Sequence, residues 1–325
     1  MLPRRLASTV SVPPTHKSPR KIVLVGAGFL GSYVAKALIA DPRNRIQIVS
    51  RHPEKLHNQL KTLGNQILAP SPIDITSPSS VSALRETMSG AAAVVSMGGL
   101  LTGTEAQMKA LQEDGVRRVA EAAKEEGVGR VVGRFATLAK YLPFLPVFGG
   151  GAVRFQPVYV GDVARAIEIC CRDDPEVTKQ VGGRVIEAGG PEVFTYREIM
   201  ELVLRFSGLQ RPILSIPYAL GALQGFFLEK LPENIFTLTR DQVTQLRDDN
   251  IVSPVPPMFS QSFEAVLKAF PSSAPSSAPP GDAGLRSVEE ILPQYLGPKQ
   301  EREEGKRTHG MQSASFEEVK RMSKK

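Results

Sequence analysis

Three glycines near the beginning of the chain have a spacing that suits the binding of phosphate groups. Gly26, Gly28 and Gly31 follow the pattern G-x-G-x-x-G, with Phe29 and Leu30 between the last two. Glycines in this pattern permit a tight turn, a close approach of the backbone to a pyrophosphate and close packing of a helix on a strand. Backbone N–H groups at the start of that helix, including those of Phe29 and Leu30, would then face the phosphates.

The residues around the glycines provide the context that this chemistry requires. Residues 22–25 are branched and apolar, which predicts a buried parallel strand, and residues 33–38 carry apolar side chains at helical spacing. The alternative is a glycine-rich surface turn in an unrelated α/β domain. A strand that ends in a glycine turn and continues into a helix favours the dinucleotide site.

The end of the second expected strand, residues 45–49, indicates which dinucleotide is bound. An Asp or Glu at this position would bind the ribose 2′-hydroxyl of NAD(H). This chain has Ser50 and Arg51 there instead, and a hydroxyl next to a guanidinium suits a 2′-phosphate. The sequence therefore predicts NADP(H) in preference to NAD(H). The alternative for Arg51 is a solvated loop arginine.

Two further segments follow expected strands and complete the predicted cofactor site. Asp74 and Ile75 come after the third strand, where the Asp74 carboxylate can accept a hydrogen bond from the adenine amino group. Equally, Asp74 can cap a turn or helix. Ser96, Met97 and Gly98 end the fourth strand and are expected to line the path to the nicotinamide.

The alternation of elements predicts an α/β fold with a doubly wound, parallel Rossmann-type sheet and a smaller C-terminal α/β domain of the substrate-binding type. Further strands are expected at residues 66–68, 91–96 and 130–132, and helices at 53–63, 80–88, 105–126, 135–142, 161–171, 196–206 and 219–228. The expected organisation is a transit peptide or disordered segment (1–20), an NAD(P)-binding domain (21–132), a C-terminal domain (133–270), a flexible linker (271–284), a closing helix (285–298) and a charged tail (299–325).

Charge and composition exclude several classes of function. The net charge is +7, but residues 1–21 contain five Lys and Arg without any acid, and residues 299–325 contain eight Lys and Arg against five acids. The body between them is near neutral, which argues against a nucleic-acid surface. No run of residues approaches the roughly 20 apolar positions of a membrane-spanning helix. Cys170 and Cys171 are the only cysteines, which excludes a disulfide scaffold, and no metal site is expected.

The first 21 residues have the composition of a mitochondrial targeting sequence. They are Arg-bearing, rich in Ser and Thr, and free of acids, because Asp41 is the first acidic residue of the chain. The alternative is a basic N-terminus that is merely disordered.

Seven stretches together resemble one protein family: GAGFLG, VVSMGGLLTGTEAQM, RFATLAKYLPFLPVFGGG, RFQPVYVGDVARAI, GGPEVFTYREIMELV, LTRDQVTQLRDDNIVSP and SVEEILPQYL. They are similar to the atypical short-chain dehydrogenases related to the NAD(P)-binding accessory subunit of mitochondrial respiratory complex I, and to its bacterial relatives. The resemblance covers nearly all of residues 21–298, and QPVYVGDV and GGPEVFTY are its specific blocks. The first glycine of the family's usual G-x-x-G-x-x-G is replaced by Val25.

The resemblance implies a peripheral, matrix-side subunit of the inner membrane that holds NADPH without turnover. Its partners would be subunits of complex I or, as in related fungal proteins, proteins of ubiquinone biosynthesis. The alternative function is an NAD(P)-dependent reductase or epimerase. A soluble mitochondrial assembly factor would use the same fold as a scaffold.

Catalytic residues of the short-chain dehydrogenase type are missing from the chain. Such an enzyme needs a Tyr and, four residues later, a Lys on one helical face. The only match is Tyr295 with Lys299, where Gly297 and Pro298 interrupt a helix. By the family pattern, a segment of ~30 or more residues is absent after Val132, through natural loss or an altered transcript. We therefore expect no catalytic residues and a sheet that is incomplete after residue 132.

Overall fold

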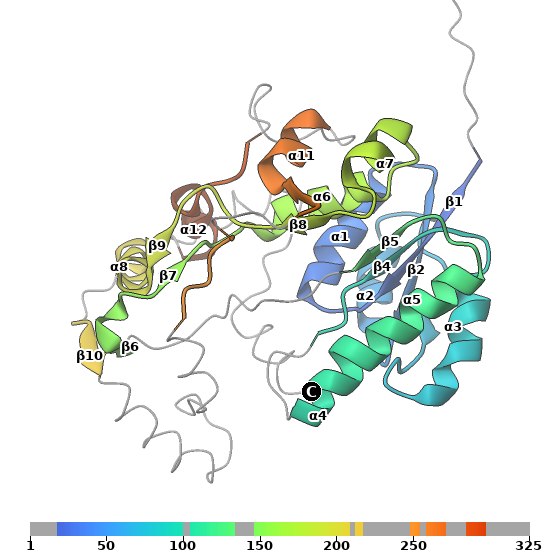
Figure 1. The fold of residues 1–325 in the computed structure, drawn as a ribbon, viewed down its shortest axis with the longest axis horizontal. Helices are drawn as coiled ribbons and strands as arrows, with labels where there is room; N and C mark the ends of the chain where they lie inside the picture. Colours follow the sequence, from blue (N-terminus) through green and yellow to red (C-terminus); the bar gives the residue numbers. More distant parts are fainter. Residues whose placement is uncertain are drawn as a thin grey trace, which may run out of the picture.

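A parallel five-stranded sheet forms the centre of the protein (Figure 1). The computed structural model describes residues 18–99, 105–133, 146–208, 212–216, 248–253, 258–270 and 284–296. The strands are β1 (Arg20–Val25), β2 (Asn44–Ser50), β3 (Ser71–Pro72), β4 (Ala91–Ser96) and β5 (Val131–Gly133), in the order β3-β2-β1-β4-β5. This order, in which β1 lies between β2 and β4, is that of the nucleotide-binding doubly wound fold.

Helices cover both faces of the sheet because the strands are apolar on both. Ile22 and Leu24 face one core, whereas Val23 and Val25 face the other, and all four are buried. The first core contains side chains of α1 (Phe29–Ile39), α2 (Glu54–Lys61), α6 (Val160–Cys170), α7 (Pro175–Val181) and α11 (Phe263–Ala269). The second contains side chains of α3 (Val81–Met88) and α5 (Val116–Glu125), which lie side by side in Figure 1.

The sheet is open at β5, as the sequence predicts for its incomplete end. Within the described residues, β5 pairs only with β4, through three residues, and the Val131 side chain is 44 % exposed. The sheet edge is therefore formed by a short strand with an apolar side chain in solvent. The helix expected at residues 135–142 lies outside the described residues.

The third strand differs from the prediction. Residues 66–68 form only an isolated bridge between Ile46 and Ile67, and β3 itself is the later pair Ser71–Pro72. Pro70 and Pro72 explain the interruption, because proline has no N–H to donate to a strand ladder.

Residues after 133 add short sheets and helices around the central layer. The expected helices at 161–171 and 196–206 are confirmed, whereas the one at 219–228 lies outside the described residues. Helix α7 was not expected, although Asp174 as N-cap and Pro175 as first residue are a typical helix start. The remaining elements are β6 (Pro146–Phe148), β7 (Arg154–Phe155), β8 (Val185–Glu187), β9 (Phe194–Thr195), α8 (Tyr196–Ser207), β10 (Leu214–Ile216), β11 (Ser260–Ser262) and α12 (Val288–Leu296).

Helices α6 and α11 follow residue 132, yet they pack in the same core as α1. The expected division into domains stays a prediction. The closing helix is present as α12, whereas most of the linker, residues 1–17 and the charged tail lie outside the described residues. None of the described helices has the length and apolar character needed to cross a bilayer.

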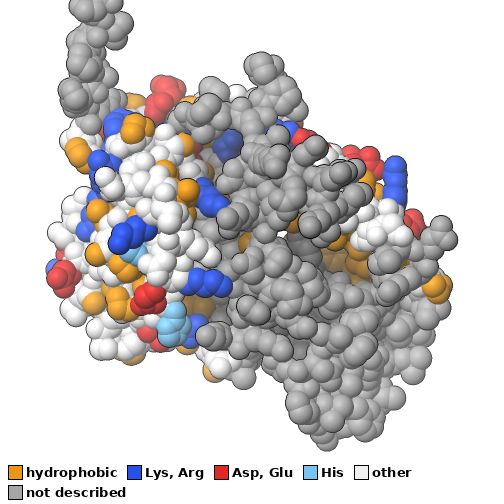
Figure 2. All heavy atoms as spheres, turned by 180° about the vertical axis from the view of Figure 1, so that it is seen from behind, with side chains coloured by type: hydrophobic (Ala, Val, Ile, Leu, Met, Phe, Trp, Pro, Cys, Tyr) orange, Lys and Arg blue, Asp and Glu red, His pale blue; other side chains and the backbone are white. Residues whose placement is uncertain are grey.

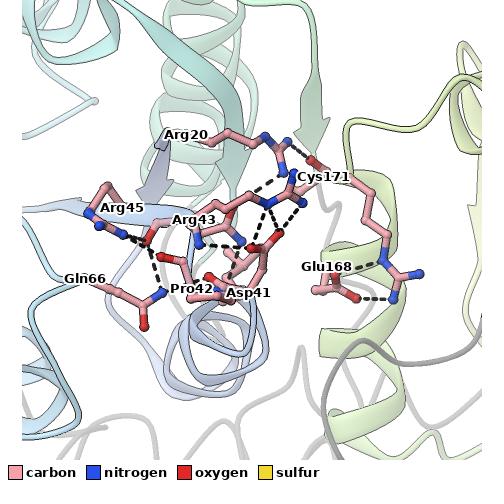
Figure 3. Close-up of polar contacts among 11 residues, drawn as sticks. Arg20, Asp41, Pro42, Arg43, Arg45, Gln66, Glu168 and Cys171 are labelled. Carbon is pink, nitrogen blue, oxygen red and sulfur yellow. Dashed lines mark hydrogen bonds and ion pairs between the residues drawn. The ribbon is translucent and has the colours of Figure 1, made fainter. Parts of the chain in front are cut away.

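A buried polar network joins the start of β1 to the end of α6 (Figure 3). Strand β1 begins at Arg20, two residues before the expected start, and Arg20 is only 9 % exposed. Its guanidinium donates to the backbone carbonyl of Cys171 and, at 3.4 Å, to Oδ1 of Asn44. Burial lowers the pKa of Arg20, while nearby Asp173 and Asp41 act in the opposite direction. The carbonyl at the end of α6 is thus satisfied by a charged donor from β1.

We expect Asp41→Asn to lower the free energy of unfolding by about 1 kcal/mol at pH 7. The Asp41 carboxylate accepts from the backbone N of Arg43 at 3.0 Å and from its Nη2 at 2.6 Å, and the side-chain bonds are the main reason why the pKa of Asp41 lies below its ordinary value. A lowered carboxylate pKa stabilises the fold above the unfolded-state pKa, about 4, and loses that effect as the pH falls through the folded-state pKa. Urea unfolding should therefore show the variant and the wild type converging below about pH 4. A constant difference at all pH values would contradict this, and Asp248→Asn, at an exposed position, is the control.

Candidate nucleotide site

The glycine turn after β1 is shaped by two close backbone approaches. Gly26 has φ +117°, and a Cβ on it would lie 3.2 Å from the carbonyl carbon of Met97. A Cβ on Gly31 would lie only 2.5 Å from the carbonyl oxygen of Gly26. These two glycines therefore allow the turn itself and the close packing of α1 on β1, as the motif predicts.

The remaining glycine of the motif, Gly28, leaves open space beside the turn. A Cβ built on Gly28 would meet no heavy atom of the described residues within 4 Å, in contrast to the crowded positions of Gly26 and Gly31. Gly28 is also the N-cap of α1, and no side chain caps this helix or places an acid in its first turn. An open backbone at an uncapped helix N-terminus is a suitable place for a pyrophosphate. The side chains of the next two residues differ, because Phe29 is 39 % exposed while Leu30 is buried.

Parallel register brings the other predicted residues to the same edge of the sheet. Val25 at the end of β1 is paired with Val49 on one side and with Ser96 on the other. The ladder continues one step further, since Gly26 N donates to Val49 O and Met97 N donates to Val25 O, each at 2.8 Å. The ends of β1, β2 and β4 thus meet beside the glycine turn.

Ser50 and Arg51 lie at this edge, at the end of β2. The Ser50 side chain is half-buried, and its carbonyl accepts from Ile73 N at 2.9 Å, which fixes the position of the turn after β3. Arg51 and the following His52 are exposed. The charge of Arg51 acts on Asp74 and helps to lower the pKa of that carboxyl. The charges of Arg51 and Asp74, which lie in two different turns, therefore interact.

Asp74 forms a local turn. Its Oδ1 accepts from the backbone N of Thr76 at 2.9 Å and from Thr76 Oγ1 at 2.8 Å. Burial would raise the pKa of Asp74, but the two bonds from Thr76 and the charge of Arg51 together lower it. The Asp74 carboxylate is thus ionised and caps its own turn, which is the alternative role that the sequence left open.

Ile75, Gly98 and Ser96 have buried or half-buried positions behind this edge. Ile75 is 5 % exposed, and a Cβ on Gly98 would lie 3.3 Å from its Cδ1. Ser96 is 2 % exposed, and its Oγ has no hydrogen-bond partner among the described residues. The sequence did not single out Arg118, whose Nη1 donates to the carbonyl oxygens of Ile75 at 2.9 Å and of Thr76 at 3.2 Å. An arginine three residues after a mid-helix glycine belongs to no recognised motif.

The described part of the chain contains no group of three or more His, Cys, Asp or Glu residues that could hold a metal ion. Both cysteines are free thiols, as expected, and burial raises the pKa of Cys170 to about 11. Tyr295 of the isolated Tyr-x-x-x-Lys match lies on α12 with its hydroxyl 3.3 Å from that of Tyr33, and Lys299 lies outside the described residues. Figure 2 shows Lys and Arg scattered among hydrophobic and acidic side chains over the described part of one face.

Comparison with known proteins agrees with this geometry. Residues 26–138 match the model of an NAD(P)H-binding protein family, and this stretch contains the glycine turn and the ends of β2, β3 and β4. These residues carry an NAD(P)H-binding family domain. The NAD(P)H-binding domain includes every residue that the sequence predicts for the cofactor, and which nucleotide it binds stays a prediction.

A curated relative extends the comparison beyond the NAD(P)H-binding domain. The chain is 35 % identical over 161 residues to an Arabidopsis thaliana protein named NADH dehydrogenase (ubiquinone) 1 alpha subcomplex subunit 9, mitochondrial. The match covers 46 % of this chain and 37 % of the relative, so the chain matches little more than a third of that protein's length. The resemblance that the sequence motifs indicate is thus confirmed for the matched part of the chain, and its extension over nearly all of residues 21–298 stays a prediction.

Two solved structures have the same fold as this chain over most of its length. Triphenylmethane reductase from Citrobacter sp., solved with NADP(H), superposes with a TM-score of 0.58 at 12 % identity and covers 84 % of this chain and 99 % of its own. The terminal R domain of the myxalamid biosynthetic pathway superposes with a TM-score of 0.55 at 15 % identity, covering 86 % of this chain and 90 % of its own. At such identities the likeness concerns the architecture.

Proposed function

We propose that this chain is a noncatalytic, NADP(H)-holding accessory subunit of mitochondrial complex I, attached peripherally at the matrix side of the inner membrane. The observation that carries the proposal is the 35 % identity over 161 residues to the named Arabidopsis subunit. In this role the nucleotide stabilises the subunit by binding only to its folded form.

The site geometry supports nucleotide holding. Gly28 leaves open space at the uncapped N-terminus of α1, and the ends of three strands meet beside it. Gly26, Gly28 and the N–H groups of Phe29, Leu30 and Gly31 would hold the pyrophosphate. The sites proposed for the remaining parts of the nucleotide are Ser50 and Arg51 for the 2′-phosphate, Asp74 and Ile75 for the adenine, and Ser96, Met97 and Gly98 for the path to the nicotinamide.

We expect Arg51→Ala to weaken NADPH binding by roughly ten- to a hundredfold, the worth of charge-assisted hydrogen bonds to a phosphate. Arg51 is exposed at the end of β2, so its loss should not disturb packing. NADH has no 2′-phosphate, and its affinity should remain within about twofold. Isothermal titration with both nucleotides measures the difference, and Arg184→Ala, at an exposed position on another part of the chain, is the control. Equal effects on NADPH and NADH would contradict the assignment of Arg51.

Association with complex I is tested in mitochondria. The tagged full-length chain should co-migrate with the complex on a native gel, and salt or carbonate should release it from the membrane without detergent. Migration at the size of the chain alone would contradict the proposed role, whereas recovery with enzymes of ubiquinone biosynthesis would favour the other set of partners. Oxidation of NADPH by the purified chain in the presence of a quinone would contradict its noncatalytic assignment.

A further inference from the structure

The helix that follows the Met97–Gly98 turn is not uniform. Its first turn, α4 (Glu105–Met108), and its last part, α5, are α-helical, but the seven residues between them, η2 (Lys109–Gly115), form a π-helix. Figure 1 shows the three parts as one continuous rod that crosses the sheet beside α3. A π segment inside an α-helix is uncommon and frequently occurs at a functional site.

The π segment determines which residues of the rod face the nucleotide edge. A shift of one residue rotates a helical side chain by about 100°, and in this segment it is Gly115 that lies against Ile75. A Cβ on Gly115 would lie 3.0 Å from Ile75 Cγ1, 3.1 Å from its Cδ1 and 3.2 Å from the carbonyl oxygen of Ala110. A side chain at this position would therefore require Ile75 or the backbone of Ala110 to move by a few tenths of an ångström.

The same rod contacts the nucleotide edge at two further points. Leu111, inside the π segment, reaches the turn after β4, where a Cβ on Gly98 would lie 3.7 Å from Leu111 Cδ1. Arg118, in the first turn of α5, donates to the carbonyl oxygens of Ile75 at 2.9 Å and of Thr76 at 3.2 Å. The rod thereby fixes the backbone of the turn after β3. It also contacts the side chain of Ile75, which packs beneath Gly98.

We propose that the π segment is a positioning element for the adenine end of the nucleotide site, with Gly115 and Arg118 as its positioning residues. It supports the turn that contains Asp74 and Ile75, which the proposed function assigns to the adenine, through Gly115 and Arg118. Its ligand is a nucleotide with an adenine base, so the inference rests on the proposed nucleotide-holding function. Neither residue needs to touch the ligand, because both act through Ile75 and the backbone of its turn.

The test compares the whole nucleotide with its adenine half. Gly115→Ala should weaken the binding of NADPH and of adenosine 2′,5′-bisphosphate, which lacks the nicotinamide half, by the same factor, at least fivefold, at a temperature well below the unfolding transition. Gly129→Ala is the matched control, because a Cβ there meets nothing within 4 Å. A loss for NADPH alone would place the effect at the other half of the site and overturn the inference.

A double-variant measurement separates positioning from a general loss of stability. If Gly115→Ala acts by displacing Ile75, the same change made in an Ile75→Ala background should have no further effect on affinity for either ligand. Undiminished losses in that background would overturn the inference. Arg118→Met, which keeps an apolar stem but removes both hydrogen bonds, gives a second route if Gly115→Ala does not fold, and it should weaken both ligands by the same factor.

The outcomes also distinguish this inference from the proposed function. If the wild-type chain binds neither NADPH nor adenosine 2′,5′-bisphosphate, the nucleotide-holding function is wrong and the inference fails with it. If the wild type binds both, and Gly115→Ala and Arg118→Met bind them equally well, only the positioning role is wrong.

Discussion

Replacement of Gly190 by alanine is expected to lower the free energy of unfolding by about 3 kcal/mol or more, because the new Cβ overlaps backbone atoms. Gly190 is buried, and a Cβ on it would overlap the carbonyl oxygen of Pro157 and lie 2.9 Å from the carbonyl carbon. The two segments cannot separate freely, since Gln156 Nε2 donates to Gly190 O at 2.7 Å and Gln156 Oε1 accepts from Val252 N at 3.0 Å.

Urea unfolding followed by circular dichroism measures this effect. Gly129→Ala is again the matched control, because the same change at that open position introduces no contact. An unchanged unfolding midpoint for Gly190→Ala would contradict the prediction. It would mean that the backbone of Pro157 moves away from the new methyl group with little loss of free energy of unfolding. The result also bears on the sequence, because Gly190 belongs to the GGPEVFTY block and Pro157 to QPVYVGDV. The two most specific blocks of the chain contact each other through this glycine.

Gly31→Val is expected to lower the free energy of unfolding by about 2–3 kcal/mol and to abolish nucleotide binding. The Cβ of any larger residue would lie 2.5 Å from the carbonyl oxygen of Gly26, and both atoms belong to the backbone framework of the glycine turn. Helix α1 would have to move away from β1, which displaces the N–H groups at its N-terminus. Thermal and urea unfolding, together with NADPH titration, measure the two effects.

Gly28→Ala is the comparison variant for Gly31→Val, and we expect it to lower NADPH affinity without lowering stability. A Cβ on Gly28 meets no atom within 4 Å in the part of the chain that the structure describes, so the free energy of unfolding should stay unchanged or rise by up to about 1 kcal/mol. NADPH affinity should still fall roughly tenfold or more, because the methyl group occupies the space into which the pyrophosphate approaches. Equal stability losses for Gly28→Ala and Gly31→Val would contradict the separate roles of the two glycines.

Most elements of the central sheet could be predicted from the local sequence pattern. The element that was misplaced has a physical explanation. Branched apolar strands and the glycine turn predicted β1, α1, β2 and β4 because each of these elements is long and periodic. The third strand was misplaced because its pairing is limited to a bridge at Ile67 and two residues after Pro70. The open sheet edge at β5 was expected from the family pattern, by which a segment is missing after Val132.

At the candidate site, the sequence located the residues but not their contacts. The strand–turn–helix context predicted Gly26, Gly28 and Gly31 with their distinct roles. It could not decide between adenine contact and turn capping for Asp74, because both need the same carboxylate. The supporting role of Arg118 depends on a one-residue change of register in the helix, and helical periodicity does not reveal such a change.

The bonds of Arg20 limit how many N-terminal residues the fold can lose. Because its guanidinium satisfies a carbonyl at the end of α6, removal of residues 1–20 would leave that carbonyl without this donor and β1 one residue shorter. An unsatisfied buried carbonyl costs about 1–3 kcal/mol. An N-terminus compatible with this fold therefore begins at or before Arg20, and N-terminal sequencing of the protein isolated from its source would locate it.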